Sequence, residues 1–250
     1  MSVELRIVED PAATCAELLL DVAAAAGQIV LAGGSTPRAA YQRAASAGTP
    51  WSRATVWFGD ERCVPPDDER SNYAMAKAAL LDPLGEAGPV VKRIRGELGP
   101  TAAAEDYERE LLAAGTPRFD LLLLGLGPDG HTASLFPDQE ALAERTKLVV
   151  GVEQPGREPV VPRVTMTLAT LASAHQIVFL VTGAEKADAV AAAFGPGAKP
   201  DPHVPASLLA PLAETVTVLL DPAAARSSEA GRGAAQSERG AGSPAEETPS

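Results

Sequence analysis

Cysteine and long apolar runs are both scarce in this sequence. Its 250 residues include only Cys15 and Cys63, which lie too far apart for a Cys-x-x-Cys motif and fit no zinc spacing. No stretch approaches the roughly 18 apolar residues that a membrane-spanning helix needs. The opening MSVELRIVED lacks the apolar segment of a secretion signal. We therefore expect reduced thiols in a cytoplasmic protein without a membrane partner.

Basic residues are also fewer than acidic residues. The chain has 21 Lys and Arg against 33 Asp and Glu, a net charge of −12. Such an excess of acid argues against non-specific binding to nucleic acid or to an anionic membrane. It leaves room for a small anionic ligand, because a pocket can be locally basic.

The C-terminal segment, residues 222–250, contains no Val, Leu, Ile, Met or aromatic residue. It cannot bury enough apolar surface to offset the loss of chain entropy on folding. We predict that this tail is disordered and that residues 1–221 form a single α/β domain.

Short apolar runs alternate with helical patterns along that domain. The predicted strands are residues 27–32, 54–59, 119–125, 147–152, 175–183 and 214–220. The predicted helices are residues 11–26, 37–47, 71–81, 101–114 and 184–194. This alternation predicts a mostly parallel sheet with helices on both faces. Ligands of such folds bind in the loops beyond the C-terminal ends of the strands.

The first such loop reads LAGGSTPRAAYQ. Gly33 and Gly34 would let backbone amides approach a ligand closely, and Ser35 and Thr36 add hydroxyl donors. A helix that begins near Pro37 would make this turn an anion site, above all for phosphate. The alternative is an ordinary strand–turn–helix link with a serine or threonine N-cap.

A charged triplet, Asp60–Glu61–Arg62, directly follows the next apolar strand. Charges at the end of a buried strand are energetically costly unless they form ion pairs or take part in binding or catalysis. Arg62 could bind a phosphate or carboxylate through both arms of its guanidinium. A surface ion pair is the alternative interpretation.

The segment GLGPDGHTASLFP, residues 125–137, allows three interpretations. Its start matches the dinucleotide pattern G-x-G-x-x-G, but that pattern requires a long helix, and Pro137 follows soon after Gly130. The turn could instead present His131, whose imidazole can accept and return a proton near neutral pH. Asp129 could orient that ring or hold a substrate hydroxyl. A histidine that only stabilises the turn remains a third possibility.

Two further cations occur near strand ends. Lys186 lies in the first turn of a predicted helix, where a positive charge is unfavourable unless an anion binds. Arg163 is similarly placed, and for both residues simple surface exposure is the alternative. No metal-ligand spacing and no G-x-S-x-G motif occurs, which disfavours metal catalysis and a serine hydrolase.

Taken together, these motifs resemble the 6-phosphogluconolactonases, within the wider group that includes glucosamine-6-phosphate deaminase. The matching stretches are AGGSTP, GDERCVPPDDERSNYAM, LLGLGPDGHTASLFP, RVTMTL, FLVTGAEKA and PASLL. The resemblance implies a Rossmann-like α/β fold and hydrolysis of 6-phospho-D-glucono-1,5-lactone to 6-phosphogluconate, in the oxidative pentose phosphate pathway. It implies a sugar-phosphate lactone as ligand and neither metal nor nucleotide as cofactor.

The resemblance also assigns roles. His131 would activate water and then protonate the leaving ring oxygen, and an amide of the glycine turn or a cation would stabilise the oxyanion. The expected catalytic residues are His131, Asp129 and Arg62. The expected substrate and phosphate site comprises Gly33, Gly34, Ser35, Thr36, Asp60, Gly130, Arg163 and Lys186. Which cation binds phosphate stays open, as does the choice between a monomer and a small homo-oligomer.

Two rival functions remain. The deaminase branch has a GHIAFNEP-like loop, whereas this chain reads GHTASLFP and lacks the Asn-Glu pair used in ring opening. A sugar-phosphate sensor would keep the pocket without turnover.

Overall fold

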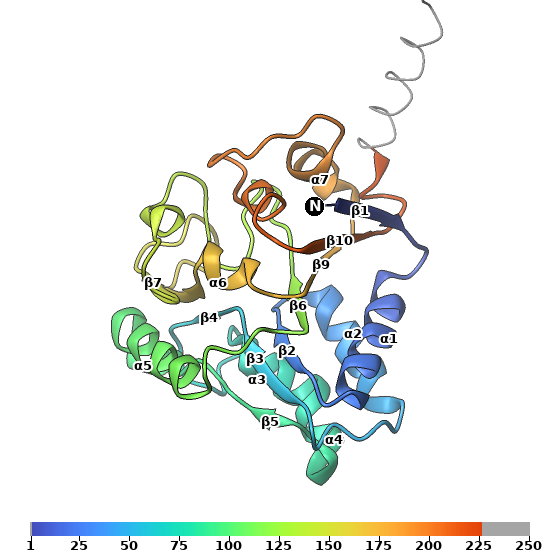
Figure 1. Ribbon diagram of the computed structural model, residues 1–250, viewed down its shortest axis with the longest axis vertical. Coiled ribbons are helices and arrows are strands. Elements are labelled where there is room, and N and C mark those ends of the chain that lie inside the picture. The colour runs from blue at the N-terminus through green and yellow to red at the C-terminus, as the bar shows by residue number, and fades with distance from the viewer. Residues whose placement is uncertain (1, 227–250) are drawn as a thin grey trace, which may run out of the picture.

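The computed structural model describes residues 2–226, and its centre is a seven-stranded sheet (Figure 1). All neighbouring strands are parallel. The order across the sheet is β1 (Ser2–Ile7), β10 (Thr215–Leu220), β9 (Gln176–Val181), β6 (Leu121–Leu124), β2 (Gln28–Leu31), β3 (Thr55–Phe58) and β5 (Val90–Val91). Strands β1 and β5 were not expected from the sequence.

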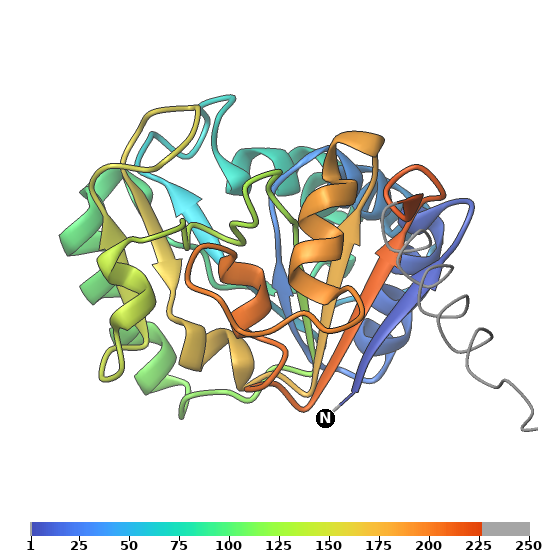
Figure 2. The same cartoon turned by 90° about the horizontal axis from the view of Figure 1, so that it is seen from above.

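Helices cover both faces of this sheet, as Figures 1 and 2 show. Helices α1 (Pro11–Ala24) and α2 (Ser35–Ser46) pack against each other on one face, whereas α7 (Ala187–Phe194) and η6 (Pro205–Leu208) lie on the other. The central strands β9, β6, β2 and β3 are largely apolar because both faces are covered there, and all four residues of β6 are buried. The predicted α/β fold is confirmed.

A second, three-stranded antiparallel sheet lies beside the first. Its order is β4 (Asp60–Arg62), β8 (Arg163–Met166), β7 (Val149–Val152), and α5 (Pro100–Ala113) packs against β7 and β8. The predicted strand at residues 147–152 therefore exists but does not belong to the parallel sheet. Only Gly59 separates β3 from β4, so the chain passes directly from one sheet to the other.

Short helices fill the connections. The predicted helix over residues 71–81 begins as an α-helix and continues as one π-helical turn. The short helical elements are α3 (Asn72–Ala76), η1 (Lys77–Leu81), α4 (Asp82–Leu84), η2 (Gly85–Ala87), η3 (Gly96–Leu98), η4 (Glu140–Ala143), α6 (Leu168–Ala172) and η5 (Ala184–Lys186). Among the helices of residues 2–226, none has the length and apolar character to cross a membrane.

The packed chain extends past the predicted boundary at residue 221. Ala224 and Ala225 are fully buried in the main core. The amide of Ala224 donates a 2.7 Å hydrogen bond to Oδ1 of Asp221, which turns the chain back onto the domain. The rest of the predicted tail, from residue 227 on, lies outside the described residues.

Candidate active site

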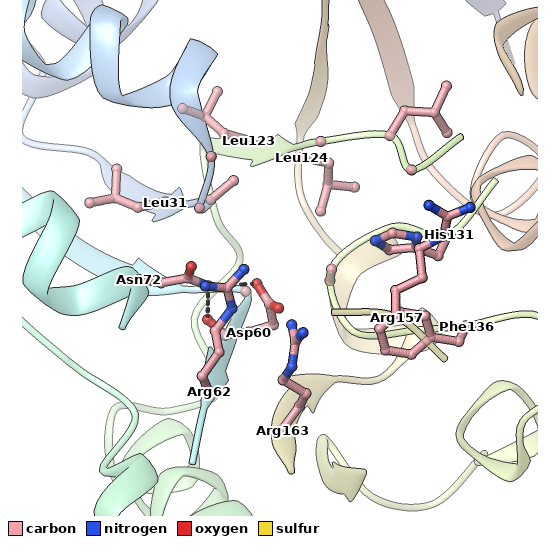
Figure 3. Close-up of a pocket in the computed structure, with 18 of the residues that line it drawn as sticks. Leu31, Asp60, Arg62, Asn72, Leu123, Leu124, His131, Phe136, Arg157 and Arg163 are labelled. Atoms are coloured by element: carbon pink, nitrogen blue, oxygen red, sulfur yellow. Dashed lines mark hydrogen bonds between the residues drawn. The ribbon is translucent and has the colours of Figure 1, made fainter. Parts of the chain in front are cut away.

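A cavity of about 230 Å³ opens at the C-terminal ends of β2, β3, β6 and β9 (Figure 3). Parallel strands bring these ends to one edge of the sheet, which is where the loops singled out from the sequence meet. The predicted residues that line the cavity are Gly33, Gly34, Asp60, Arg62, His131, Arg163 and Lys186. The other predicted residues, Ser35, Thr36, Asp129 and Gly130, are not among the residues that line it.

The turn after β6 presents His131. The amide of Gly127 donates to the carbonyl of His131 at 2.8 Å, and Gly130 has a φ of +81° that a glycine adopts without strain. A β-carbon at Gly130 would lie 2.7 Å from Cγ1 of Val204, so Gly130 serves the shape of the turn. No helix follows Gly130 as far as Gln139, and the dinucleotide interpretation of this segment is therefore wrong.

His131 is paired with Asp129. Nδ1 of the ring lies 2.5 Å from Oδ1 of the carboxylate, and a carboxylate can only accept, so Nδ1 carries the proton. Nε2 is then left with a free lone pair on a ring that lines the cavity. Burial lowers the pKa of His131 below its usual value, although the charge of Asp129 acts in the opposite direction. The lowered pKa favours the neutral imidazole, the form that can accept a proton.

Asp129 is bound on its other side by Arg157, whose Nε donates to Oδ2 at 2.9 Å. Burial alone would raise the pKa of Asp129, but the hydrogen bonds from His131 and Arg157 and the charge of His131 lower it below its usual value. Arg157 was not predicted as a site residue. It lies in the irregular segment 153–162, where no motif and no periodicity marks it.

The glycine turn after β2 leads into α2 with Gly34, not Ser35 or Thr36, as the N-cap residue. Gly34 has a φ of +110°, and no side chain within the described part of the chain caps the helix there. The amides of its first turn are therefore available to an anion. Thr36 instead contacts Thr182 at the end of β9, with their Oγ1 atoms 2.8 Å apart.

Asp60 is buried and held from two sides. Asn72 Nδ2 donates to its Oδ1 at 3.1 Å, and Ser134 Oγ donates to its Oδ2 at 2.7 Å. The neighbouring Glu61 points away from the cavity and accepts from the amides of Asn72 and Tyr73, both at 2.8 Å. Burial raises the pKa of Glu61. The triplet is thus not a surface ion pair.

Asn72 and Ser134 are further residues that sequence reasoning left without a role. Asn72 belongs to the SNY motif and Ser134 to the GHTASLFP motif, so the motifs marked the segments but not these side chains. A β-carbon at Gly33 would lie 2.0 Å from Oδ1 of Asn72. Gly33 is therefore required for the close approach of Asn72 and Asp60 to the glycine turn.

Three cations of the cavity, Arg62, Arg163 and Lys186, form no ion pair with a carboxylate among residues 2–226. Arg163 is 4% exposed and donates to the carbonyls of Pro159 and Val161. Burial, together with the charge of Arg62, lowers the pKa of Arg163, and burial also lowers that of Lys186. Positive charge gathered at one cavity, without a matching carboxylate within residues 2–226, favours an anionic ligand, despite the net negative charge of the chain.

The remaining histidines lie outside the cavity. His175 and His203 are partly exposed and face Glu214 and Asp138. In the part of the chain that the structure describes, no group of three or more His, Cys, Asp or Glu side chains is placed to hold a metal ion.

Comparison with known proteins agrees with this geometry. Residues 6–218 match the family described as glucosamine-6-phosphate isomerases/6-phosphogluconolactonase. A 6-phosphogluconolactonase of Synechocystis is 38% identical over 205 residues, which cover 77% of this chain and 81% of that protein. One of Mycobacterium leprae is 40% identical over 211 residues, covering 79% and 84%. The chain belongs to this family, and the predicted resemblance is confirmed.

Solved structures show the same fold. A 6-phosphogluconolactonase from Trypanosoma cruzi superposes with a TM-score of 0.78 at 28% identity, covering 90% of this chain and 96% of that one. A monomeric glucosamine-6-phosphate deaminase gives a TM-score of 0.76 at 21% identity, covering 91% and 100%. Both branches of the family thus share this architecture, and the fold alone does not separate them.

Proposed function

We propose that this protein hydrolyses 6-phospho-D-glucono-1,5-lactone to 6-phosphogluconate, with His131 as general base and without a metal ion. The observation that carries the proposal is the His131–Asp129 pair, with its 2.5 Å contact, at the wall of a cavity lined by Arg62, Arg163 and Lys186. These three cations have no carboxylate partner within residues 2–226. The names of the curated relatives point to the same reaction.

The phosphate of the substrate would bind at the first turn of α2. Free backbone amides and the helix dipole favour an anion there. Lys186 lies in the connection that follows β9. Thr182, in the same connection, contacts Thr36 in the first turn of α2. We assign Lys186 to the phosphate for this reason. Arg62 and Arg163 line the same cavity beside Asp60 (Figure 3).

The chemical step follows from the state of His131. Nε2 removes a proton from a water molecule, whose oxygen forms a bond to the lactone carbonyl carbon. The oxyanion that results is stabilised by a cation or by a backbone amide of the glycine turn. The bond from the carbonyl carbon to the ring oxygen then breaks, and His131 returns its proton to that oxygen. The product is the free acid, and His131 returns to its original protonation state.

The test is lactone decay. Glucose 6-phosphate, a dehydrogenase and excess NADP generate the lactone, and its loss is then followed with and without the protein, since it also hydrolyses spontaneously. We expect acceleration by the wild type and a loss of about 100-fold to 10,000-fold in His131→Gln. His175→Gln is the matched control, because His175 also faces a carboxylate, Glu214, but lies outside the cavity.

Two further measurements test the absence of a metal ion and distinguish the lactonase from a deaminase or a sensor. Full activity in the presence of a chelator is expected if no metal takes part. No acceleration by the wild type would refute the lactonase assignment. Release of ammonia from glucosamine 6-phosphate would then indicate the deaminase, and saturable binding of the sugar phosphate without turnover would indicate a sensor.

A further inference from the structure

Arg157 forms an ion pair at the cavity that the reaction scheme above does not use. Its Nε lies 2.9 Å from Oδ2 of Asp129, while Oδ1 of the same carboxylate lies 2.5 Å from Nδ1 of His131. The carboxylate therefore has a partner on each oxygen. Figure 3 shows Arg157 beside His131 at the same wall of the cavity.

We propose that Arg157 is a positioning residue for this reaction: it anchors the far oxygen of Asp129 and so holds the imidazole of His131 with Nε2 toward the cavity. The inference rests on the proposed lactonase function. Arg157 does not need to touch the substrate for this role, because it acts on His131 only through Asp129.

The local backbone explains why such an anchor is useful. Asp129 lies in a turn between Gly127 and Gly130, and the last torsion of an aspartate side chain has a broad energy minimum. One hydrogen bond to His131 would leave the carboxylate free to rotate about that torsion. A second partner on the opposite oxygen, supplied by a different segment of the chain, fixes its plane and with it the ring.

Arg157 also acts on His131 by its charge. Asp129 and Asp60 favour the protonated imidazole, whereas burial and the charge of Lys186 favour the neutral one. Because the positive charge of Arg157 offsets the negative charge of Asp129, Arg157 favours the neutral form of the His131 imidazole. The charged groups around the ring are Asp129 from its own turn, Asp60 from β4, Lys186 from the β9–α7 connection, Arg163 from β8 behind Phe136, and Arg157.

The pKa of His131 can be measured without any assay of activity. The chain has three histidines, so His131→Gln assigns the imidazole signal of His131 in an NMR titration. We expect Arg157→Gln to raise the pKa of His131 by about half a unit. This is the size of effect expected when one charge is removed near the imidazole in partly solvent-exposed surroundings. The acid limb of the kcat/KM profile, which reports the free enzyme, should move up by the same amount, and kcat at its plateau should fall about tenfold.

Two variants control this experiment. Arg157→Lys keeps the charge but not the geometry of the guanidinium, so it should restore the pKa of His131 and only part of kcat. Arg43→Gln removes another arginine–aspartate pair, with Asp10, whose arginine side chain is also 46% exposed. It lies outside the cavity and should leave both the pKa and kcat as in the wild type.

The outcomes are distinct. If Arg157→Gln lowers only the melting temperature, while the pKa of His131 and kcat stay as in the wild type, the positioning role is refuted. An unchanged pKa in both Arg157 variants refutes it as well. A wild type without lactonase activity refutes the proposed function, and the titration then still decides whether Arg157 governs the state of His131.

Discussion

Gly127 lies directly beneath the ring of His131: a β-carbon at position 127 would be 2.0 Å from Nδ1 of the imidazole and 2.5 Å from Oδ1 of Asp129. The contact between His131 and Asp129 therefore occupies the space that any other residue at position 127 would need. The absence of a side chain at Gly127 is part of the site.

Gly127→Ala should separate His131 from Asp129. We expect a loss of activity of at least about 100-fold and, because the turn must shift, a decrease of about 1–3 kcal/mol in the free energy of unfolding. Lactone decay and urea denaturation measure these quantities. Gly125→Ala adds the same methyl group to the same turn, where it meets no atom within 4 Å, and should keep wild-type stability. Equal stability and activity in Gly127→Ala would contradict this account of the turn.

The pH dependence of kcat/KM, which reports the free enzyme, should reflect the lowered pKa of His131. Because the base must be neutral, kcat/KM should still be above half of its maximum at about pH 6.5, the ordinary pKa of histidine. The measurement is kcat/KM from about pH 5 to pH 8, with the spontaneous rate subtracted. A midpoint above about pH 7 would show that the buried imidazole is not the titrating group.

The same lowered pKa predicts how stability changes with pH. A histidine that binds its proton less readily in the folded state stabilises the fold above its unfolded pKa, and this contribution is lost as the pH falls through the folded pKa. The melting temperature of the wild type should therefore fall more steeply with decreasing pH than that of His131→Gln. Parallel melting curves for the two proteins would argue that folding does not perturb His131.

Lys186→Gln should weaken binding of the phosphate. We expect KM to rise by about tenfold to 100-fold, the loss expected for one hydrogen bond between charged groups. Glucono-1,5-lactone without a phosphate provides the internal control, since its slow hydrolysis should not depend on Lys186. Lys199→Gln, at an exposed lysine after α7, controls for the change in net charge. A similar effect on both lactones would place Lys186 at the carbonyl instead.

A chain that ends at Asp221 should be less stable than one that ends at Arg226. The shorter chain loses two fully buried alanines and the 2.7 Å hydrogen bond from the amide of Ala224 to Asp221. We expect a difference of about 1–3 kcal/mol in the free energy of unfolding, measured by urea denaturation. Identical midpoints would show that the buried alanines contribute little.

Much of the fold was predictable because its strands are short, apolar and separated by helical patterns. Runs such as residues 27–32 and 119–125 can satisfy both covered faces of a parallel sheet. The second sheet was not predictable in this way. Strand β4 consists of Asp60, Glu61 and Arg62, and three charged residues carry no strand signal until β8 pairs with them.

The sequence alone determined the α/β class, the strands whose ends carry chemistry, and the histidine that the glycine turn presents. These features depend on local patterns and on the rule that parallel strands end at one edge. Tertiary structure decided which side chains meet there. Arg157 contacts Asp129, and Ser134 and Asn72 hold Asp60. Such contacts join segments far apart in the chain, and their distances follow from packing, which no local pattern encodes.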